Sequence, residues 1–276
     1  MRVLLVLLLA APAALALGCQ ESGFDERKET ARPLKVQHVK GESKVPGQAE
    51  RVATLTLDTL DDTLALGVRP VLAVVEDDSL PGYLRGPARG VETIEPMVPA
   101  GEKPAPGDLA PLRAANPGVI VGRQGALFEA LSKIAPTVIV EPGSDRWKLN
   151  LRLMGEALGR TNDAEGLLTD YDRRVAMVRR ATGGRSKVAI VRPTEGGVAF
   201  APRDSFAGTI LADVGLRQVG SPARADLVLV AQPKGEQLQV DGAFEQADVD
   251  LRTWWGPGGV LQARAALSDL RGILDR

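Results

Sequence analysis

The stretch from Arg146 to Ala181 constrains the fold most, because it predicts two consecutive helices with an α/β-like segment on either side. Apolar residues between Trp147 and Leu158 recur four, three and four positions apart, which is the pattern of a helix with one buried stripe. Gly159 interrupts this helix. A second stripe runs from Leu168 to Val178 and is ended by the two flexible residues Gly183-Gly184.

The start of the second helix carries its own signal. Asn162 is followed three residues later by Glu165, which matches a capping box and predicts a helix from Asp163 to Arg180. Such a helix would be roughly 27 Å long at 1.5 Å per residue, enough to cross from one lobe to another. We therefore expect two lobes joined by a stiff helical strut, with a ligand cleft between them.

Composition narrows the class of partner. The 276 residues suffice for one large or two small domains. The 34 basic residues nearly balance the 35 acidic ones, so we expect no nucleic acid partner and no general attraction to anionic membranes. One Cys rules out an intramolecular disulfide framework, and one His rules out a cage of imidazole ligands. We expect no cofactor and no metal bound directly by the chain.

The N-terminus predicts the location of the protein. Arg2 precedes an apolar run that ends at Gly18-Cys19, which is the layout of a secretory signal peptide and too short for a comfortable membrane span. Residues 15–19 resemble a bacterial lipobox, in which Cys19 would be lipidated, although Ala16 and Leu17 depart from the usual pattern. The alternative is an ordinary secreted protein in which Cys19 has no role. The lipoprotein interpretation predicts an extracytoplasmic protein anchored to the cell membrane by its lipid.

These signals divide the chain into five parts. They are a lipoprotein signal peptide at 1–19, a flexible tether at 20–33, an N-terminal α/β lobe at 34–144, a helical spine at 145–184 and a C-terminal α/β lobe at 185–276.

The first lobe opens as a β-α-β unit. Strands are predicted at 34–39, 51–57 and 71–75, with Asp58 or Thr59 capping the helix between the last two. Residues 76–108 are rich in Pro, Gly and charge and predict a long loop, which in a compact domain is usually functional or mobile. Candidate contacts in this loop are Tyr83, Arg85 and Lys103, although each could equally be an ordinary solvated residue.

Two further strand-to-helix corners predict ligand contacts. The strand at 119–122 runs into Arg123-Gln124 before a helix, and α/β folds place ligands where a strand's carboxyl end meets a helix N-terminus. Arg203 follows the predicted strand 198–201, and Ser205 is predicted to cap the next helix. A guanidinium can donate two parallel hydrogen bonds to an anionic ligand, which makes Arg203 the first-choice contact. Trp254 and Trp255 precede a last helix, and we expect one indole to point inward and the other toward the cleft.

Several segments share an order and spacing with a known family. They are Glu50-Arg51-Val52 with TLDTLDDTLALGVRPV, GDLAPLRAANPGVIVG from Gly107, LSKIAPTVIVE, WKLNLRLMGEALGR, and PRDSFAGTILADVGL from Pro202. Together they cover most of residues 34 to 274, and they resemble the substrate-binding proteins of iron(III)-siderophore and cobalamin ABC transporters. The resemblance implies the siderophore/cobalamin-type periplasmic-binding fold: two α/β lobes joined by a long interdomain helix, with a shallow cleft that changes little on binding.

The resemblance also implies a function. The protein would be a monomer that captures an iron(III)-siderophore without catalysis and delivers it to a membrane permease. Loops around Lys103 and Arg123 would face the cleft, with an aromatic near Trp254. Family members dock on the permease through one acidic residue on each lobe. On the first lobe of this chain Ala110 stands at the docking position, and Asp108 is the nearest acid. Alternatives are a binder of cobalamin or haem, or an anchored accessory module of the same fold. An enzyme is not expected, because the sequence shows no nucleophile elbow, no phosphate loop and no carboxylate pair with a plausible partner.

Overall fold

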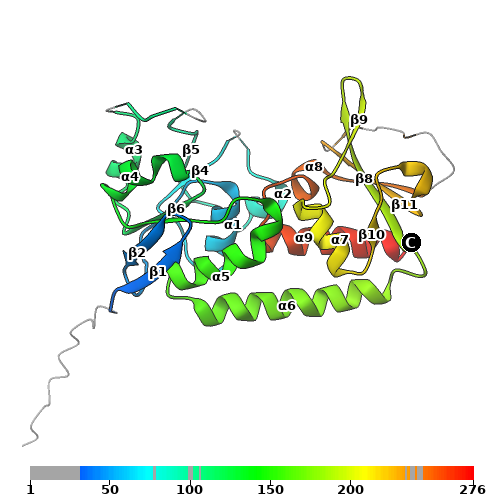
Figure 1. Ribbon diagram of the computed structural model, residues 1–276, viewed down its shortest axis with the longest axis horizontal. Coiled ribbons are helices and arrows are strands. Elements are labelled where there is room, and N and C mark those ends of the chain that lie inside the picture. The colour runs from blue at the N-terminus through cyan, green and yellow to red at the C-terminus, as the bar shows by residue number, and fades with distance from the viewer. Residues whose placement is uncertain are drawn as a thin grey trace, which may run out of the picture. The chain divides into compact units, whose positions relative to one another are not determined.

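The computed structural model describes residues 32–276 except 77–78, 99–101, 106, 234, 237–239 and 241–244. The predicted signal peptide, most of the tether and the lipidation of Cys19 lie outside these residues. Within them the chain forms two α/β lobes joined by a long helix (Figure 1), as predicted.

The first lobe is a five-stranded parallel sheet in the order β5-β4-β3-β6-β7. Its strands are β3 (Val52–Thr54), β4 (Leu72–Val74), β5 (Thr93–Ile94), β6 (Val119–Gly122) and β7 (Thr137–Ile139). Its helices are α1 (Leu57–Ala65), α2 (Gly82–Arg85), α3 (Ala110–Ala114) and α4 (Phe128–Ser132), with a 3-10 turn at Gly125–Leu127. α2 and β5 lie in the stretch that the sequence predicts as loop. α1 begins earlier than predicted, with Thr56 as its N-cap.

Both faces of this parallel sheet are covered by other elements, as parallel sheets require. Val119 and Val121 of β6 belong to the core that contains Trp147, whereas Ile120 packs with Leu112 of α3 and Leu131 of α4. The antiparallel hairpin of β1 (Leu34–His38) and β2 (Gly41–Val45) lies beside β7.

Two helices form the spine. They are α5 (Trp147–Ala157), preceded by a 3-10 turn at Ser144–Arg146, and α6 (Thr161–Arg180). α6 contacts α5 at one end and α9 of the second lobe further along (Figure 1). Its 20 residues correspond to roughly 30 Å.

The predicted capping box at the start of α6 is wrong. The N-cap is Arg160, and Asn162 already lies in the first turn, where its side chain cannot take the capping position. Glu165 instead accepts a hydrogen bond from Arg152 Nε of α5 at 2.7 Å. Glu165 therefore pairs with the neighbouring helix α5 instead of capping its own helix.

The second lobe has a sheet in the order β10-β8-β11-β12, with β9 antiparallel to β8. Its strands are β8 (Lys187–Thr194), β9 (Gly197–Phe200), β10 (Arg217–Gln218), β11 (Leu227–Gln232) and β12 (Glu245–Asp250). Its helices are α7 (Phe206–Asp213), α8 (Leu251–Trp254) and α9 (Val260–Leu274), with a 3-10 turn at Pro222–Arg224. Ser205 caps α7 as predicted, because its Oγ accepts from the Gly208 amide at 3.2 Å. β12 and α8 were not predicted.

The two lobes also meet directly, where α1 approaches the N-terminus of α9. The Asp62 carboxylate accepts a hydrogen bond from the Val260 amide at 3.1 Å. The Asp61 carboxylate accepts from the amides of Leu261 at 2.7 Å and Gln262 at 2.9 Å. These are amides that a helix cannot satisfy within itself. Two carboxylates of the first lobe thus cap a helix of the second.

Candidate functional site

The strand order of both sheets defines the place for a site. In the first sheet the chain builds outward from β3 to β4 and β5, and then returns to add β6 on the other side of β3. In the second sheet the same reversal falls between β8 and β11. Ligands of open α/β sheets bind outside the carboxyl ends of strands at such switch points.

A pocket of about 370 Å³ occupies this position and takes residues from both lobes. Its lining consists of Thr56, Leu57, Asp58, Glu76 and Arg123 from the first lobe and Arg192, Leu251, Arg252, Trp255, Gly256 and Pro257 from the second. Arginine side chains, an indole face and apolar surface therefore converge at the carboxyl ends of the strands. This set suits an anionic ligand that also carries apolar or aromatic groups.

Arg123 follows β6 as predicted and lines the pocket. Its Nε lies 2.6 Å from Oδ2 of Asp58, which is buried in the first turn of α1. Its Nη2 donates to the carbonyl of Pro257 in the second lobe at 3.2 Å. Arg123 therefore ties the switch-point loops of the two lobes together.

The second lobe supplies two arginines that the sequence analysis did not identify. Arg192 lies near the carboxyl end of β8 with its guanidinium 5.2 Å from the ring centroid of Trp255, a cation–π geometry. Arg252 follows β12 and donates to the carbonyl and hydroxyl of Ser79. A signal for Arg192 was available, since it follows the buried run 188–191 as Arg123 follows 119–122. Arg252 could not be predicted in the same way, because the alternating and acidic residues of β12 lack the pattern of a buried strand.

The adjacent tryptophans face different environments. Trp254 is 1% exposed, belongs to the main core, and donates through Nε1 to Asp269 at 3.1 Å. Trp255 lines the pocket. The structure therefore places Trp254 in the core instead of the cleft, because its indole fills the space between α8 and α9. Trp255 is the aromatic of the pocket.

Arg203 is not part of this pocket, which corrects the first choice made from sequence. It lies in a separate hollow with Lys187, Arg217 and Asp226, which are at or next to the amino ends of the parallel strands. The physical reason is strand direction: β9 is antiparallel to β8, so the corner after β9 falls at the opposite edge of the sheet. A strand-to-helix corner predicts a ligand site only when its strand runs parallel to the others.

Gln124 is also used differently from the prediction. Its Nε2 donates to the Leu55 carbonyl at 2.9 Å, and its Oε1 accepts from the Arg123 amide at 3.0 Å. It lines a small apolar hollow of about 30 Å³ instead of the main pocket. Gln124 holds the loop that presents Arg123.

The candidates from the long loop do not line the pocket. Tyr83 is half-buried and its hydroxyl lies 3.3 Å from Gln262 Oε1, and burial raises the pKa of this phenol. Arg85 is exposed and donates to the Leu80 carbonyl at 3.1 Å. Lys103 is exposed in the segment 102–105. Asp108, the candidate docking acid, is half-buried and accepts from the Ala105 amide at 2.6 Å.

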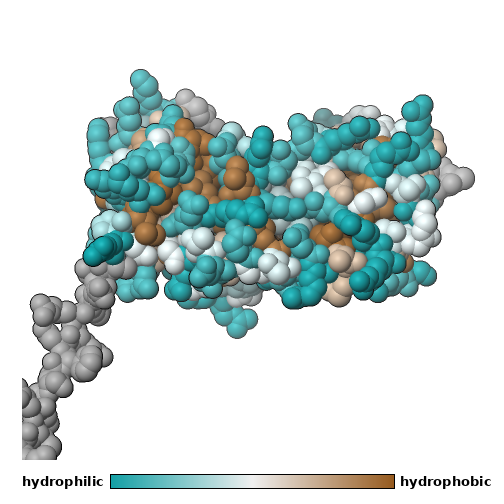
Figure 2. Space-filling model, turned by 60° about the horizontal axis from the view of Figure 1, so that its bottom comes forward, coloured by the Kyte–Doolittle hydropathy of each residue, from teal (hydrophilic) through white to brown (hydrophobic). Residues whose placement is uncertain are grey.

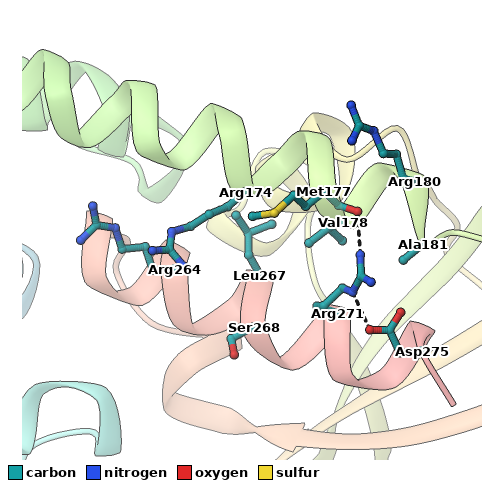
Figure 3. A pocket seen from close by; sticks show the side chains of 10 residues that line it. All are labelled: Arg174, Met177, Val178, Arg180, Ala181, Arg264, Leu267, Ser268, Arg271 and Asp275. Atoms are coloured by element: carbon teal, nitrogen blue, oxygen red, sulfur yellow. Dashed lines mark hydrogen bonds and ion pairs between the residues drawn. The ribbon is translucent and has the colours of Figure 1, made fainter.

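A larger hollow, of about 670 Å³, lies between α6 and α9 (Figure 3). Arg264 pairs with Asp170 of α6 at 2.9 Å, and Arg271 donates to the Met177 carbonyl at 2.9 Å. The hydrogen bond from Arg174 holds the pKa of Asp170 below its usual value. These arginines join the two helices, and no strand end contributes to the lining. The face shown in Figure 2, in which the bottom of the Figure 1 view comes forward, is mostly hydrophilic and carries smaller apolar areas. The smaller pocket at the strand ends is therefore the candidate ligand site.

Among the described residues there is no group of three His, Cys, Asp or Glu side chains placed to hold a metal ion. The described part of the chain also contains no helix with the length and apolarity needed to cross a membrane.

Comparison with known proteins identifies the family. The family model described as periplasmic binding protein matches residues 52–242. A probable siderophore-binding lipoprotein of Bacillus subtilis, YfiY, is 30% identical over 228 residues, covering 78% of this chain and 67% of its own length. An iron-uptake system-binding protein of the same organism is 24% identical over 223 residues, covering 78% of this chain and 68% of that protein.

The fold has solved counterparts. The crystal structure of Staphylococcus aureus SirA complexed with staphyloferrin B aligns with a TM-score of 0.72 at 22% identity, covering 87% of this chain and 98% of SirA. Its fold agrees with the two lobes and joining helix seen here. The chain thus belongs to the periplasmic binding protein family of non-catalytic substrate-binding proteins, as its sequence pattern predicts.

Proposed function

We propose that this protein is the extracytoplasmic substrate-binding component of an ABC transporter, and that it captures an iron(III)-siderophore in the pocket formed by Arg123, Arg192, Arg252 and Trp255. The observation that carries the proposal is the convergence of these side chains from both lobes at the switch points. The names of the relatives, a siderophore-binding lipoprotein and an iron-uptake binding protein, support the same ligand class.

The chemistry of the pocket fits a preformed iron chelate. The chelator already fills the coordination sphere of the iron, so the protein supplies no metal ligand and contributes only charge, hydrogen-bond donors and aromatic surface. Guanidinium groups bind carboxylate or catecholate oxygens with paired hydrogen bonds. The indole of Trp255 offers a face to apolar or aromatic parts of the ligand.

A fluorescence titration tests this function. The purified protein is titrated with ferric complexes of catecholate, carboxylate and hydroxamate siderophores, with cobalamin and haem as comparison ligands. Saturable quenching of tryptophan emission by a ferric siderophore is expected, because Trp255 lines the pocket. Saturable binding of cobalamin or haem alone would show that the ligand is not an iron(III)-siderophore. No response to any of these compounds would overturn the proposal in favour of an accessory module.

Delivery to a permease is a second part of the proposal. Asp108 is the acid nearest to the position at which the family places its docking residue on the first lobe. We further propose a monomer anchored through a lipid on Cys19, in line with the lipoprotein name of one relative. Asp108→Asn should leave siderophore affinity unchanged and lower iron-siderophore uptake by iron-starved cells. Wild-type uptake by this variant would remove Asp108 from the docking surface.

A further inference from the structure

Arg123 is already paired before any ligand arrives. The Asp58 side chain is 3% exposed, and its Oδ2 lies 2.6 Å from Arg123 Nε. Its Oδ1 is buried and has no hydrogen-bond partner among the described residues. A ligand anion that binds the guanidinium of Arg123 must therefore compete with a carboxylate of the protein itself.

Asp58 belongs to a group of three buried carboxylates on one turn of α1. Asp61 and Asp62 lie behind it and cap the N-terminus of α9. Burial raises the pKa of Asp61 to about 7 and raises the pKa of Asp62 well above its usual value. Two positive charges oppose these shifts, because Arg264 lowers the pKa of Asp61 and Arg123 lowers that of Asp62.

The remaining charged groups near this turn do not replace Arg123. Tyr83 of α2 is kept neutral by burial, with its pKa raised. Arg252 at the start of α8 donates hydrogen bonds to Ser79, and Glu76 at the pocket wall is exposed. When a ligand anion binds Arg123, Asp58 loses its ion-pair partner and Asp62 loses the positive charge that lowers its pKa. Asp62, whose pKa is already raised by burial, then holds a proton more tightly.

We propose that Asp58 is the internal counter-anion of Arg123, and that an anionic ligand replaces it at the guanidinium. This inference rests on the proposed function and adds a positioning residue that a ligand anion must displace. Because Arg123 lowers the pKa of Asp62, neutralisation of Arg123 in the bound state favours protonated Asp62, so affinity for an anionic ligand rises as pH falls.

Calorimetry with two ligands tests the inference. The purified full chain is titrated at pH 7.5, in phosphate and in Tris, with ferric enterobactin, an anionic tricatecholate, and with ferrichrome, a neutral trihydroxamate. The difference in heat between the buffers gives the protons taken up on binding. We expect net proton uptake with ferric enterobactin and none with ferrichrome.

Asp58→Asn keeps the size of the side chain and removes its charge. It should bind ferric enterobactin at least fivefold more tightly than the wild type at pH 8. Glu129→Gln, which changes an exposed acid on α4, is the matched control and should leave this affinity unchanged. Circular dichroism and the melting temperature check that both variants are folded.

The outcomes are separable. Absence of heat with both ligands, together with a silent fluorescence panel, contradicts the proposed function itself. Binding of ferric enterobactin without proton uptake, weaker binding by folded Asp58→Asn, or binding of ferrichrome alone leaves the transport function standing and overturns the role of Asp58.

Discussion

Trp254 and Trp255 are consecutive residues with opposite surroundings, since the first is buried with its Nε1 on Asp269 and the second lines the pocket below Arg192. The short helix α8 ends between them, and this places one indole in the core and the other in the cleft. Stability and ligand response are thereby separated between two neighbouring side chains.

Exchange of each tryptophan for phenylalanine should separate these roles. Trp255→Phe is expected to remove most of the ligand-dependent quenching while leaving the melting temperature within a few degrees of wild type. Trp254→Phe should keep the quenching and lower the free energy of unfolding by roughly 2 kcal/mol, because it leaves a gap and an unpaired Asp269 carboxylate. Quenching that survives Trp255→Phe and vanishes in a folded Trp254→Phe would contradict the assignment.

The packing of the spine can be tested with two glycines. A Cβ atom built on Gly155 of α5 would lie 2.7 Å from the Ala164 Cβ of α6, whereas a Cβ on Gly166 meets nothing within 4 Å. Gly155→Ala should therefore destabilise the protein by about 1–3 kcal/mol through overpacking. Gly166→Ala should stabilise it by up to about 1 kcal/mol through helix propensity. Denaturant unfolding measures both, and equal stabilisation by the two changes would show that the helices are not in close contact.

The caps on α9 predict a pH dependence of stability. Burial raises the pKa of Asp61 from its ordinary value of 3.8 to about 7, so the folded state binds the proton more tightly. This stabilisation is complete below about pH 4 and is lost as pH rises through 7, with about 1.4 kcal/mol lost between pH 6 and pH 8.

Asp61→Asn isolates this effect, because the amide does not titrate. The unfolding free energy of the wild type minus that of the variant should fall by about 1.4 kcal/mol as pH rises from 6 to 8. Urea unfolding at each pH measures it. His38, whose pKa is lowered by burial, and Asp269, whose pKa is raised by burial, cancel in the difference, because Asp61 contributes to neither shift. Asp62 does not cancel, since the charge of Asp61 raises its pKa. A difference that is constant with pH would contradict the prediction.

The sequence predicted correctly those features that depend on a single helix or strand. The two spine helices, the cap by Ser205 and the buried stripe of the last helix follow from periodicity and side-chain chemistry alone. The position of Arg123 could also be predicted, because a loop after a buried strand is local information.

What could not be predicted depends on the relation between elements. Arg203 was misplaced because nothing in residues 198–203 shows that β9 runs against β8. Asn162 was misread because α6 begins at Thr161 and Glu165 pairs with Arg152 of α5, a residue that the capping pattern does not include. Arg252 follows the edge strand β12, whose alternating acidic residues lack the continuous apolar run of a buried strand. The pairing of Asp58 with Arg123 joins residues 65 positions apart and needs the sheet order to be known.

The central claim is that the ligand binds at the carboxyl ends of the strands. The most direct test is the affinity of Arg123→Ala and of Arg203→Ala for the ferric siderophore that the wild type binds most tightly. Arg123→Ala should weaken binding by roughly 10-fold or more, as expected for loss of a hydrogen-bonded charge. Arg203→Ala, which removes an exposed arginine from the opposite edge of the sheet, should stay within about twofold of wild type. Unchanged binding by Arg123→Ala together with a large loss in Arg203→Ala would contradict the account.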